Sequence, residues 1–177
     1  MIHIEKTKLD GVLLIKPKVF EDFRGNYTMT YNQKEYLEAF KNHDIKEISF
    51  VEDDISTSNK NVLRGIHGDT NTAKLVSCLE GKFYLVIVNN IPEHPQYKQW
   101  VSFNISEFNR WQVYIPEGFG NGHLVISDRA IFSYKQSSYY NPEGQFTLMW
   151  NDPDLNIWWP VKNPILSQRD QFGHFID

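Results

Sequence analysis

The feature that most constrains the fold is a period of two in the apolar residues. Val101, Phe103 and Ile105 alternate with polar residues, and similar runs occur at 27–31, 111–115 and 146–150. Successive side chains of a strand point to opposite faces, so each run predicts a strand with one face on a core. The run 83–88 is continuously apolar, which predicts a strand buried on both faces. Further strands are expected near 11–15, 45–51, 74–79, 122–126 and 130–135.

Composition supports a β fold. The chain has 12 Phe, 9 Tyr and 5 Trp but only three Ala, and aromatic side chains suit a pleated sheet whereas helix-rich folds rely on Ala. Turn signals such as PEG at 116–118 and NPEG at 141–144 separate the short strands. We therefore predict an all-β sandwich or barrel, with one domain over 1–177. Only two helices are expected, one over 33–40 with Asn32 as N-cap and a short one after Ser167.

Charge and cysteine content exclude several classes of protein. A net charge of −4 leaves no basic stripe for a nucleic-acid backbone. No apolar run approaches the ~20 residues of a membrane span, and the opening residues lack the apolar stretch of a signal peptide. Cys78 is the single cysteine, so no intrachain disulfide forms. We expect a reduced, cytoplasmic protein with no nucleic-acid or membrane partner.

The six histidines do not form a metal-binding motif. None of them pairs as H-x-H or H-x-x-x-H, the close spacing typical of a metal-binding β-barrel. The sequence therefore predicts no metal and no other cofactor.

One histidine has unusual neighbours. His67 ends the strand-like segment VLRGIH at 62–67, which also carries Arg64. Regular alternation would put Arg64 and His67 on opposite faces, unless Gly65 marks a bulge that re-aims one of them. A structural Arg and a buried His explain this pattern as well as a functional pair does.

Three further polar residues have ordinary explanations when each is taken alone. Lys74 begins a strand-like run, which alone indicates a solvated charge. Tyr134 lies in a predicted strand, which alone indicates a side chain that packs against its neighbours. Asp170 reads as the acidic residue of a helix that begins after Ser167.

Taken together, the motifs resemble one known family. The segments are VFEDFRGNYTMTY (19–31), NKNVLRGIH (59–67), KLVSCLEGKFYLVIV (74–88), QVYIPEGFGNGHLVIS (112–127), YKQSSYY (134–140), WNDP (150–153) and LSQRD (166–170). In this order and spacing they resemble the dTDP-4-dehydrorhamnose 3,5-epimerases, or RmlC-like nucleotide-sugar epimerases, over about residues 2–172. The resemblance implies a jelly-roll or cupin-like β-barrel that forms a homodimer and works without metal.

The implied reaction inverts C3, C5 or both on a nucleotide-linked 4-keto-6-deoxy sugar. A base removes a proton beside the ketone, charge develops on the C4 oxygen, and an acid returns a proton to the opposite face. By resemblance, His67 is the base, Asp170 the carboxylate that orients it, Tyr134 the opposing acid and Lys74 the cation near the C4 oxygen. Arg64 resembles a group that holds the diphosphate, as does Arg24 with weaker support. Tyr27, Tyr139 and Tyr140 are expected to stack on the sugar or the base.

The chain departs from the family pattern at several positions. Where the family reads A-H-G-F this chain has GNGH at 120–123, so Asn121 replaces a pocket His, and His123 either substitutes for it or faces the core. The usual D-E-R-G reads DFRG at 22–25, the aromatic-Gln after His67 reads GD, and Q-D-N reads EDD at 52–54. Carboxylates only accept hydrogen bonds, so Glu52 or Asp54 would favour a base with N–H donors, such as guanine, over thymine. This suggests GDP rather than dTDP, and a resemblance to the branch of the family that acts on GDP-4-keto-6-deoxyheptoses for capsule or O-antigen polysaccharides.

Two other functions fit the same residues. A nucleotide-sugar 3,4-ketoisomerase on a related scaffold would also move the carbonyl. A non-catalytic sugar-binding cupin would bind the sugar without exchanging its protons. A metal-dependent cupin oxygenase is disfavoured because clustered ligands are missing.

Overall fold

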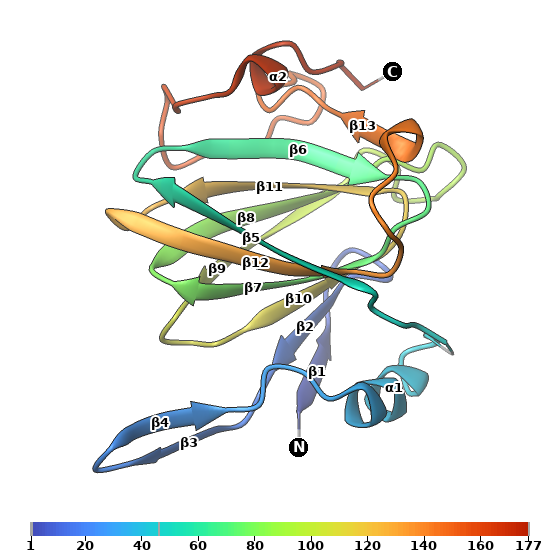
Figure 1. Cartoon of the computed structure of the whole chain (residues 1–177). Helices are drawn as coiled ribbons and strands as arrows, with labels where there is room; N and C mark the ends of the chain where they lie inside the picture. Colours follow the sequence, from blue (N-terminus) through green and yellow to red (C-terminus); the bar gives the residue numbers. More distant parts are fainter. Residues whose placement is uncertain (1, 46, 177) are drawn as a thin grey trace.

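Two antiparallel sheets face each other and form most of the molecule (Figure 1). The computed structural model describes residues 2–45 and 47–176. The six-stranded sheet contains, in spatial order, β1 (His3–Lys6), β2 (Leu13–Lys16), β10 (Gln112–Ile115), β7 (Lys74–Glu80), β12 (Arg129–Gln136) and β5 (Glu52–Asn59). The five-stranded sheet contains β13 (Gln145–Thr147), β6 (Leu63–Asp69), β11 (Phe119–Val125), β8 (Lys82–Asn89) and β9 (Trp100–Ser106). The expected all-β, jelly-roll-like class is confirmed.

Strand β8 shows how the layers are built. Phe83, Leu85 and Ile87 belong to the core between the sheets, together with residues such as Val76 and Phe132. The alternate residues Tyr84, Val86 and Val88 instead pack under the C-terminal segment, which covers the outer face of the five-stranded sheet. Both faces of β8 are buried, as its continuous apolar run predicts.

Two helices form where they were predicted. Helix α1 (Gln33–Lys41) begins after Asn32, whose side chain accepts a hydrogen bond from the Glu35 N–H. Its residues Tyr36 and Phe40 pack on the outer face of the six-stranded sheet. Helix α2 (Gln168–Gln171) begins after Ser167, whose hydroxyl accepts from the Asp170 N–H. A short 3-10 helix spans Pro142–Gly144.

Three strand predictions were wrong in extent. The run at 47–51 forms no strand, and β5 begins only at Glu52; Lys46, within the predicted 45–51, lies outside the described residues. Residues 27–31 contribute only to β4 (Gly25–Thr28), because the chain then leaves the hairpin that β4 forms with β3 (Val19–Asp22). Of 146–150, only the beginning belongs to β13, since Met149 N–H donates to the His174 carbonyl instead of continuing along β6.

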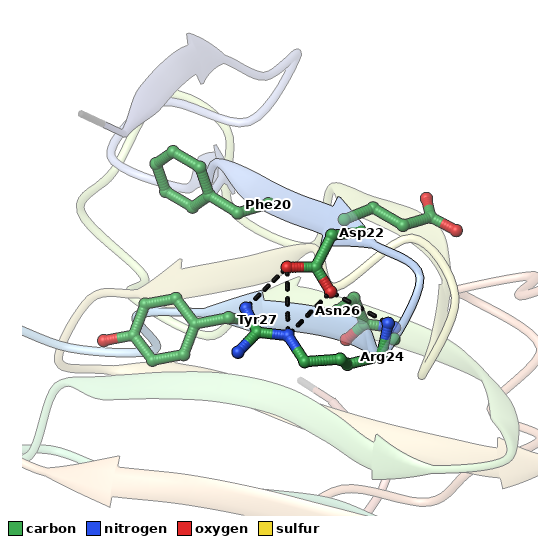
Figure 2. Close-up of a pocket in the computed structure, with 7 residues that line it drawn as sticks. Phe20, Asp22, Arg24, Asn26 and Tyr27 are labelled. Atoms are coloured by element: carbon green, nitrogen blue, oxygen red, sulfur yellow. Dashed lines mark hydrogen bonds and ion pairs between the residues drawn. The ribbon is translucent and has the colours of Figure 1, made fainter.

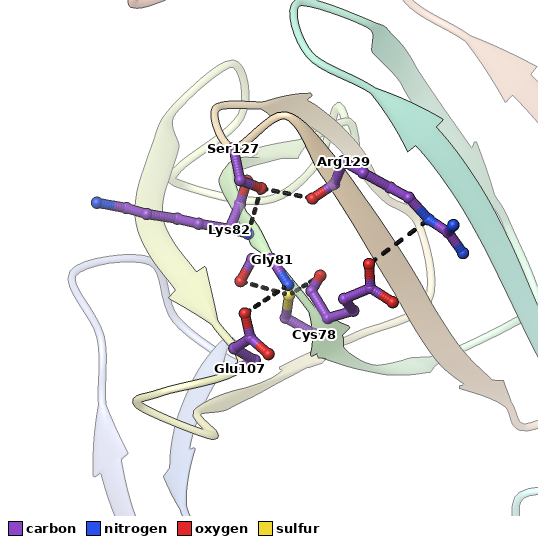
Figure 3. A network of polar contacts seen from close by, with 7 residues as sticks. Cys78, Gly81, Lys82, Glu107, Ser127 and Arg129 are labelled. Carbon is purple, nitrogen blue, oxygen red and sulfur yellow. Dashed lines mark hydrogen bonds and ion pairs between the residues drawn. The ribbon is translucent and has the colours of Figure 1, made fainter.

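The single cysteine lies in a turn network (Figure 3). Cys78 is buried, and its Sγ contacts the carbonyl oxygens of Glu80 and Gly81 at 3.1 and 3.3 Å. Burial raises the pKa of the thiol to about 12, so it stays protonated. Glu107 accepts from the Gly81 N–H at 3.2 Å, which fixes the turn between β7 and β8.

No helix among the described residues is long and apolar enough to cross a bilayer.

Candidate active site

A cavity of about 220 Å³ opens between the two sheets. Its lining residues are Ser56, Arg64, His67, Lys74, Asn121, His123, Phe132, Tyr134, Gln136, Tyr140, Gln145 and Arg169. The residues at most 9% exposed, which we call the floor, are Lys74, Asn121, His123, Phe132 and Gln136. The solvent-exposed ones, which we call the rim, are Arg64, Tyr140 and Arg169. The cavity thus brings together seven residues predicted for the site, from segments far apart in the sequence: His67, Lys74, Tyr134, Arg64, Asn121, His123 and Tyr140.

His67 on β6 is held by a buried carboxylate. Its Nε2 lies 2.5 Å from Asp170 Oδ1, and Asp170 is 2% exposed. Burial raises the pKa of Asp170, but hydrogen bonds from His67 and Ser167 and the charge of His67 outweigh it, so the pKa lies below its ordinary value. An ionised Asp170 favours the tautomer with hydrogen on Nε2, which leaves the Nδ1 lone pair of a neutral His67 free to accept a proton.

A bulge at Gly65 and Ile66 puts Arg64 and His67 in the same cavity. In the register of β6 with β11, His67 is opposite Asn121 and Arg64 is opposite His123. Gly65 and Ile66 on β6 are therefore both opposite the single residue Gly122 on β11. Gly65 has a φ of +122°, and a Cβ there would lie 2.6 Å from the Asn121 carbonyl oxygen. Only glycine fits this close approach. The bulge left open by the sequence is therefore present, and regular alternation does not hold here.

Lys74 and Tyr134 come from the opposite sheet. Lys74 Nζ lies 3.4 Å from Asn121 Oδ1 and 5.8 Å from the centre of the Tyr134 ring. Burial lowers the pKa of Lys74 to about 8, against the raising effect of Asp69, so the ammonium remains largely charged at neutral pH. Burial also raises the pKa of Tyr134, and the charges of Asp54 and Glu52 raise it further, which keeps the phenol protonated.

The carboxylates of β5 hold one edge of the cavity. Gln136 Nε2 donates to Glu52 Oε1 at 2.7 Å and to Asp54 Oδ2 at 3.0 Å. Glu52 Oε2 also accepts from the Tyr140 N–H at 3.1 Å. Glu52 and Asp54 do not line the cavity themselves, but they orient Gln136 and Tyr140, which do.

The rim carries two guanidinium groups. Arg64 Nε donates to Ser58 Oγ at 2.9 Å, and Arg169 Nε donates to Thr147 Oγ1 at 2.8 Å. Arg169 and Gln136 were missed by the sequence reasoning although they lie in the LSQRD and YKQSSYY motifs. Gln145 was missed because it lies in none of the quoted motifs.

Comparison with known proteins assigns the family. Residues 6–177 match the family described as dTDP-4-dehydrorhamnose 3,5-epimerase. The Shigella flexneri enzyme of that name is 39% identical over 180 residues, covering 99% of this chain and 97% of its own. This chain belongs to the dTDP-4-dehydrorhamnose 3,5-epimerase family.

Other members of the family agree in sequence and in structure. A Streptomyces niveus dTDP-4-dehydrorhamnose 3-epimerase is 32% identical over 96% of this chain and 82% of its own. The Legionella pneumophila dTDP-6-deoxy-D-glucose-3,5-epimerase, solved in complex with dTDP-4-keto-L-rhamnose, superposes with a TM-score of 0.92 at 36% identity, over 99% of this chain and 93% of that one. The chain is therefore an isomerase of the epimerase class.

Besides Glu52 and Asp54, three further residues predicted for this epimerase-family site lie outside its cavity. Tyr139 is 73% exposed and only its neighbour Tyr140 lines the cavity. Arg24 and Tyr27 lie on the β3–β4 hairpin, where Arg24 forms an ion pair with Asp22 at 2.6 Å (Figure 2). Figure 1 shows this hairpin projecting away from the body of the molecule.

Proposed function

We propose that this chain epimerises a nucleotide-linked 4-keto-6-deoxy sugar, with His67 removing a proton from the sugar and Tyr134 returning one to the opposite face. The supporting observation is that the two residues line one cavity from opposite sheets, with the Lys74 ammonium beside Tyr134. A sugar ring bound between the sheets would present one face to the imidazole and the other to the phenol. Inversion of a carbon needs such an arrangement, because the proton leaves from one face and returns to the other.

The surroundings of each catalytic group suit the role that we propose for it. His67 takes the proton from the carbon beside the ketone, and Asp170 stabilises the imidazolium that results. Charge then develops on the C4 oxygen, where the buried Lys74 ammonium stabilises it. Tyr134 donates its proton to the opposite face of the carbon. The exposed guanidinium groups of Arg64 and Arg169 bind the diphosphate at the rim.

The carboxylates of β5 bear on which nucleotide the chain binds. Glu52 and Asp54 only accept hydrogen bonds, and beside the rim they suit the N–H and amino edge of guanine. A GDP-linked heptose is therefore a candidate substrate, whereas several relatives are named for dTDP sugars. The setting we propose is the cytoplasmic synthesis of sugars for capsule or O-antigen polysaccharides.

Solvent-deuterium exchange tests both the reaction and the nucleotide. Purified protein is incubated in D2O with dTDP- and GDP-linked 4-keto-6-deoxy sugars, and NMR follows C3, C5 and the carbonyl. We expect deuterium at C3, C5 or both, inverted configuration, and a carbonyl that stays at C4. Migration of the carbonyl to C3 would assign a 3,4-ketoisomerase, and binding without exchange would assign a sugar-binding cupin. Exchange with dTDP sugars alone would refute the role of Glu52 and Asp54 in guanine recognition.

We also propose that the chain works as a homodimer. The β3–β4 hairpin exposes Val19, Phe20, Phe23 and Tyr27 at 38, 51, 98 and 68%. An isolated two-stranded hairpin with apolar side chains is marginally stable in water, so a second copy of the chain is a natural partner for it. Such packing would carry Arg24 and Tyr27 toward the cavity of the other subunit and account for their distance from their own.

Mixing two inactive variants tests this arrangement. Arg24→Ala and His67→Ala are each expected to be poorly active as homodimers. Co-expressed, they form heterodimers in which one cavity has His67 of its own chain and Arg24 of the other. We expect these heterodimers to regain up to about half the wild-type activity per dimer, because one of the two sites is complete. No recovery in a dimer verified by light scattering would place Arg24 in its own subunit's site, and a monomeric wild-type protein would refute the dimer.

A further inference from the structure

His123 lies on the cavity floor with a polar atom that the proposed reaction does not use. The residue is 3% exposed, and its Nε2 is buried with no hydrogen-bond partner among residues 2–45 and 47–176. It is one of the residues that line the cavity, two positions after Asn121 on β11. Residues two apart on a strand share a face, so both side chains point between the sheets.

Packing alone does not explain an imidazole at this position. The ring stacks on Phe132 with centroids 4.1 Å apart and an interplanar angle of 5°, and it lies 5.3 Å from Phe83. A phenyl ring would make the same contacts without burying a nitrogen that lacks a partner. Unpaired buried polar atoms are costly and uncommon in native proteins. We therefore expect His123 Nε2 to hydrogen-bond a ligand that binds in the cavity.

We infer that His123 is a specificity-determining residue that hydrogen-bonds a hydroxyl group of the bound sugar. This inference rests on the proposed function, since it assumes that a nucleotide-linked sugar occupies the cavity. The sugar must reach the floor, because Lys74 and Asn121 are there and His67 lies on the same sheet as His123. The charged diphosphate belongs at the rim with Arg64 and Arg169.

The chemistry of His123 fits a hydroxyl better than an anion. Burial, together with the electrostatic effects of Arg64 and His67 and against the opposing effect of Asp170, lowers the pKa of His123 to about 3. The ring is therefore neutral at physiological pH, with one nitrogen donor and one nitrogen acceptor. A hydroxyl can both donate and accept, whereas a phosphate oxygen only accepts and is bound better by the guanidinium groups of the rim.

The test compares sugars that differ by single hydroxyl groups. Wild type, His123→Phe, His123→Asn and His123→Gln are assayed by deuterium exchange on nucleotide-linked 4-keto-6-deoxyhexose, its 2-deoxy and 3-deoxy analogues, and the analogue with a hydroxyl at C6. We expect wild type to prefer sugars that carry one particular hydroxyl by about 10- to 100-fold in kcat/KM. His123→Phe should lose that preference, and Asn or Gln, whose amides lie near the positions of Nδ1 and Nε2, should restore part of it. The matched control His174→Phe, at an exposed histidine that does not line the cavity, should keep the wild-type preference.

Thermal unfolding separates specificity from a structural role. His123→Phe should have an unfolding midpoint equal to or above that of wild type, because it removes an unpaired nitrogen and keeps the ring contacts. Loss of activity by the same factor on every sugar, or an unchanged hydroxyl preference in His123→Phe, would overturn the inference while the epimerase function stands. Absence of deuterium exchange in wild type on every sugar would refute the proposed function, and the inference with it.

Discussion

Replacing His67 with alanine is expected to abolish deuterium exchange at both C3 and C5. His67 lines the cavity, and its Nε2 lies 2.5 Å from Oδ1 of the buried Asp170. Without the imidazole the enolate does not form, so inversion and exchange stop together. We expect a loss of about 10²- to 10⁴-fold, the range typical of general-base catalysis, measured by NMR in D2O.

Two further variants test whether the loss of exchange in His67→Ala is due to loss of the base. His174→Ala removes an exposed histidine and should exchange at the wild-type rate. Asp170→Asn keeps the size of the side chain but can donate to Nε2, which favours the tautomer that leaves Nδ1 protonated and unable to accept. It should therefore lose most of the exchange activity while the fold persists. Exchange in His67→Ala within tenfold of wild type would exclude His67 as the base.

The sequence predicted strand β8, which packs on the core, better than strand β5, which borders the cavity. β8 is apolar on both faces and was predicted almost to its ends. β5 was missed because its inward positions are Glu52, Asp54, Ser56 and Ser58, which face polar surroundings, while its outward face carries Ile55 at 65% exposure. A hydrophobic period of two disappears when the inner face of a strand borders a polar cavity.

The site depends on contacts that single residues do not reveal. His67 and Asp170 are 103 positions apart, and their pairing follows from the placement of α2 over β6. Family resemblance pointed to both residues, but periodicity alone could only allow a bulge at Gly65. The Lys74–Asn121 contact and the unpaired His123 nitrogen emerge only when the two sheets are packed together.

The β3–β4 hairpin shows a second limit of predicting structure from hydrophobic periodicity. The alternation around Tyr27 predicts a strand with one face on a core, yet β3 and β4 pair only with each other in the described part of the chain. A period of two in the apolar residues indicates that one face of the strand is apolar. It does not indicate whether the same chain or another chain covers that face. The exposed Phe20 and Phe23 are consistent with a cover supplied by a second copy.

Replacing Tyr134 with phenylalanine is expected to separate exchange from inversion. The variant keeps the ring beside Lys74 Nζ but lacks the proton donor for the opposite face of the sugar. His67 can still remove a proton and return deuterium to the face from which it came. We expect inversion to fall about 10²-fold while exchange with retained configuration persists, so the ratio of the two products reverses.

The same NMR experiment decides whether Tyr134 is the acid. Integration of deuterated product with retained and with inverted configuration gives the ratio directly. Tyr114→Phe is the matched control, because Tyr114 packs beside α1 on the outer face of the six-stranded sheet, and it should leave the ratio unchanged. Equal loss of exchange and inversion in Tyr134→Phe would instead make Tyr134 necessary for forming the enolate, as a group that positions Lys74 or the sugar.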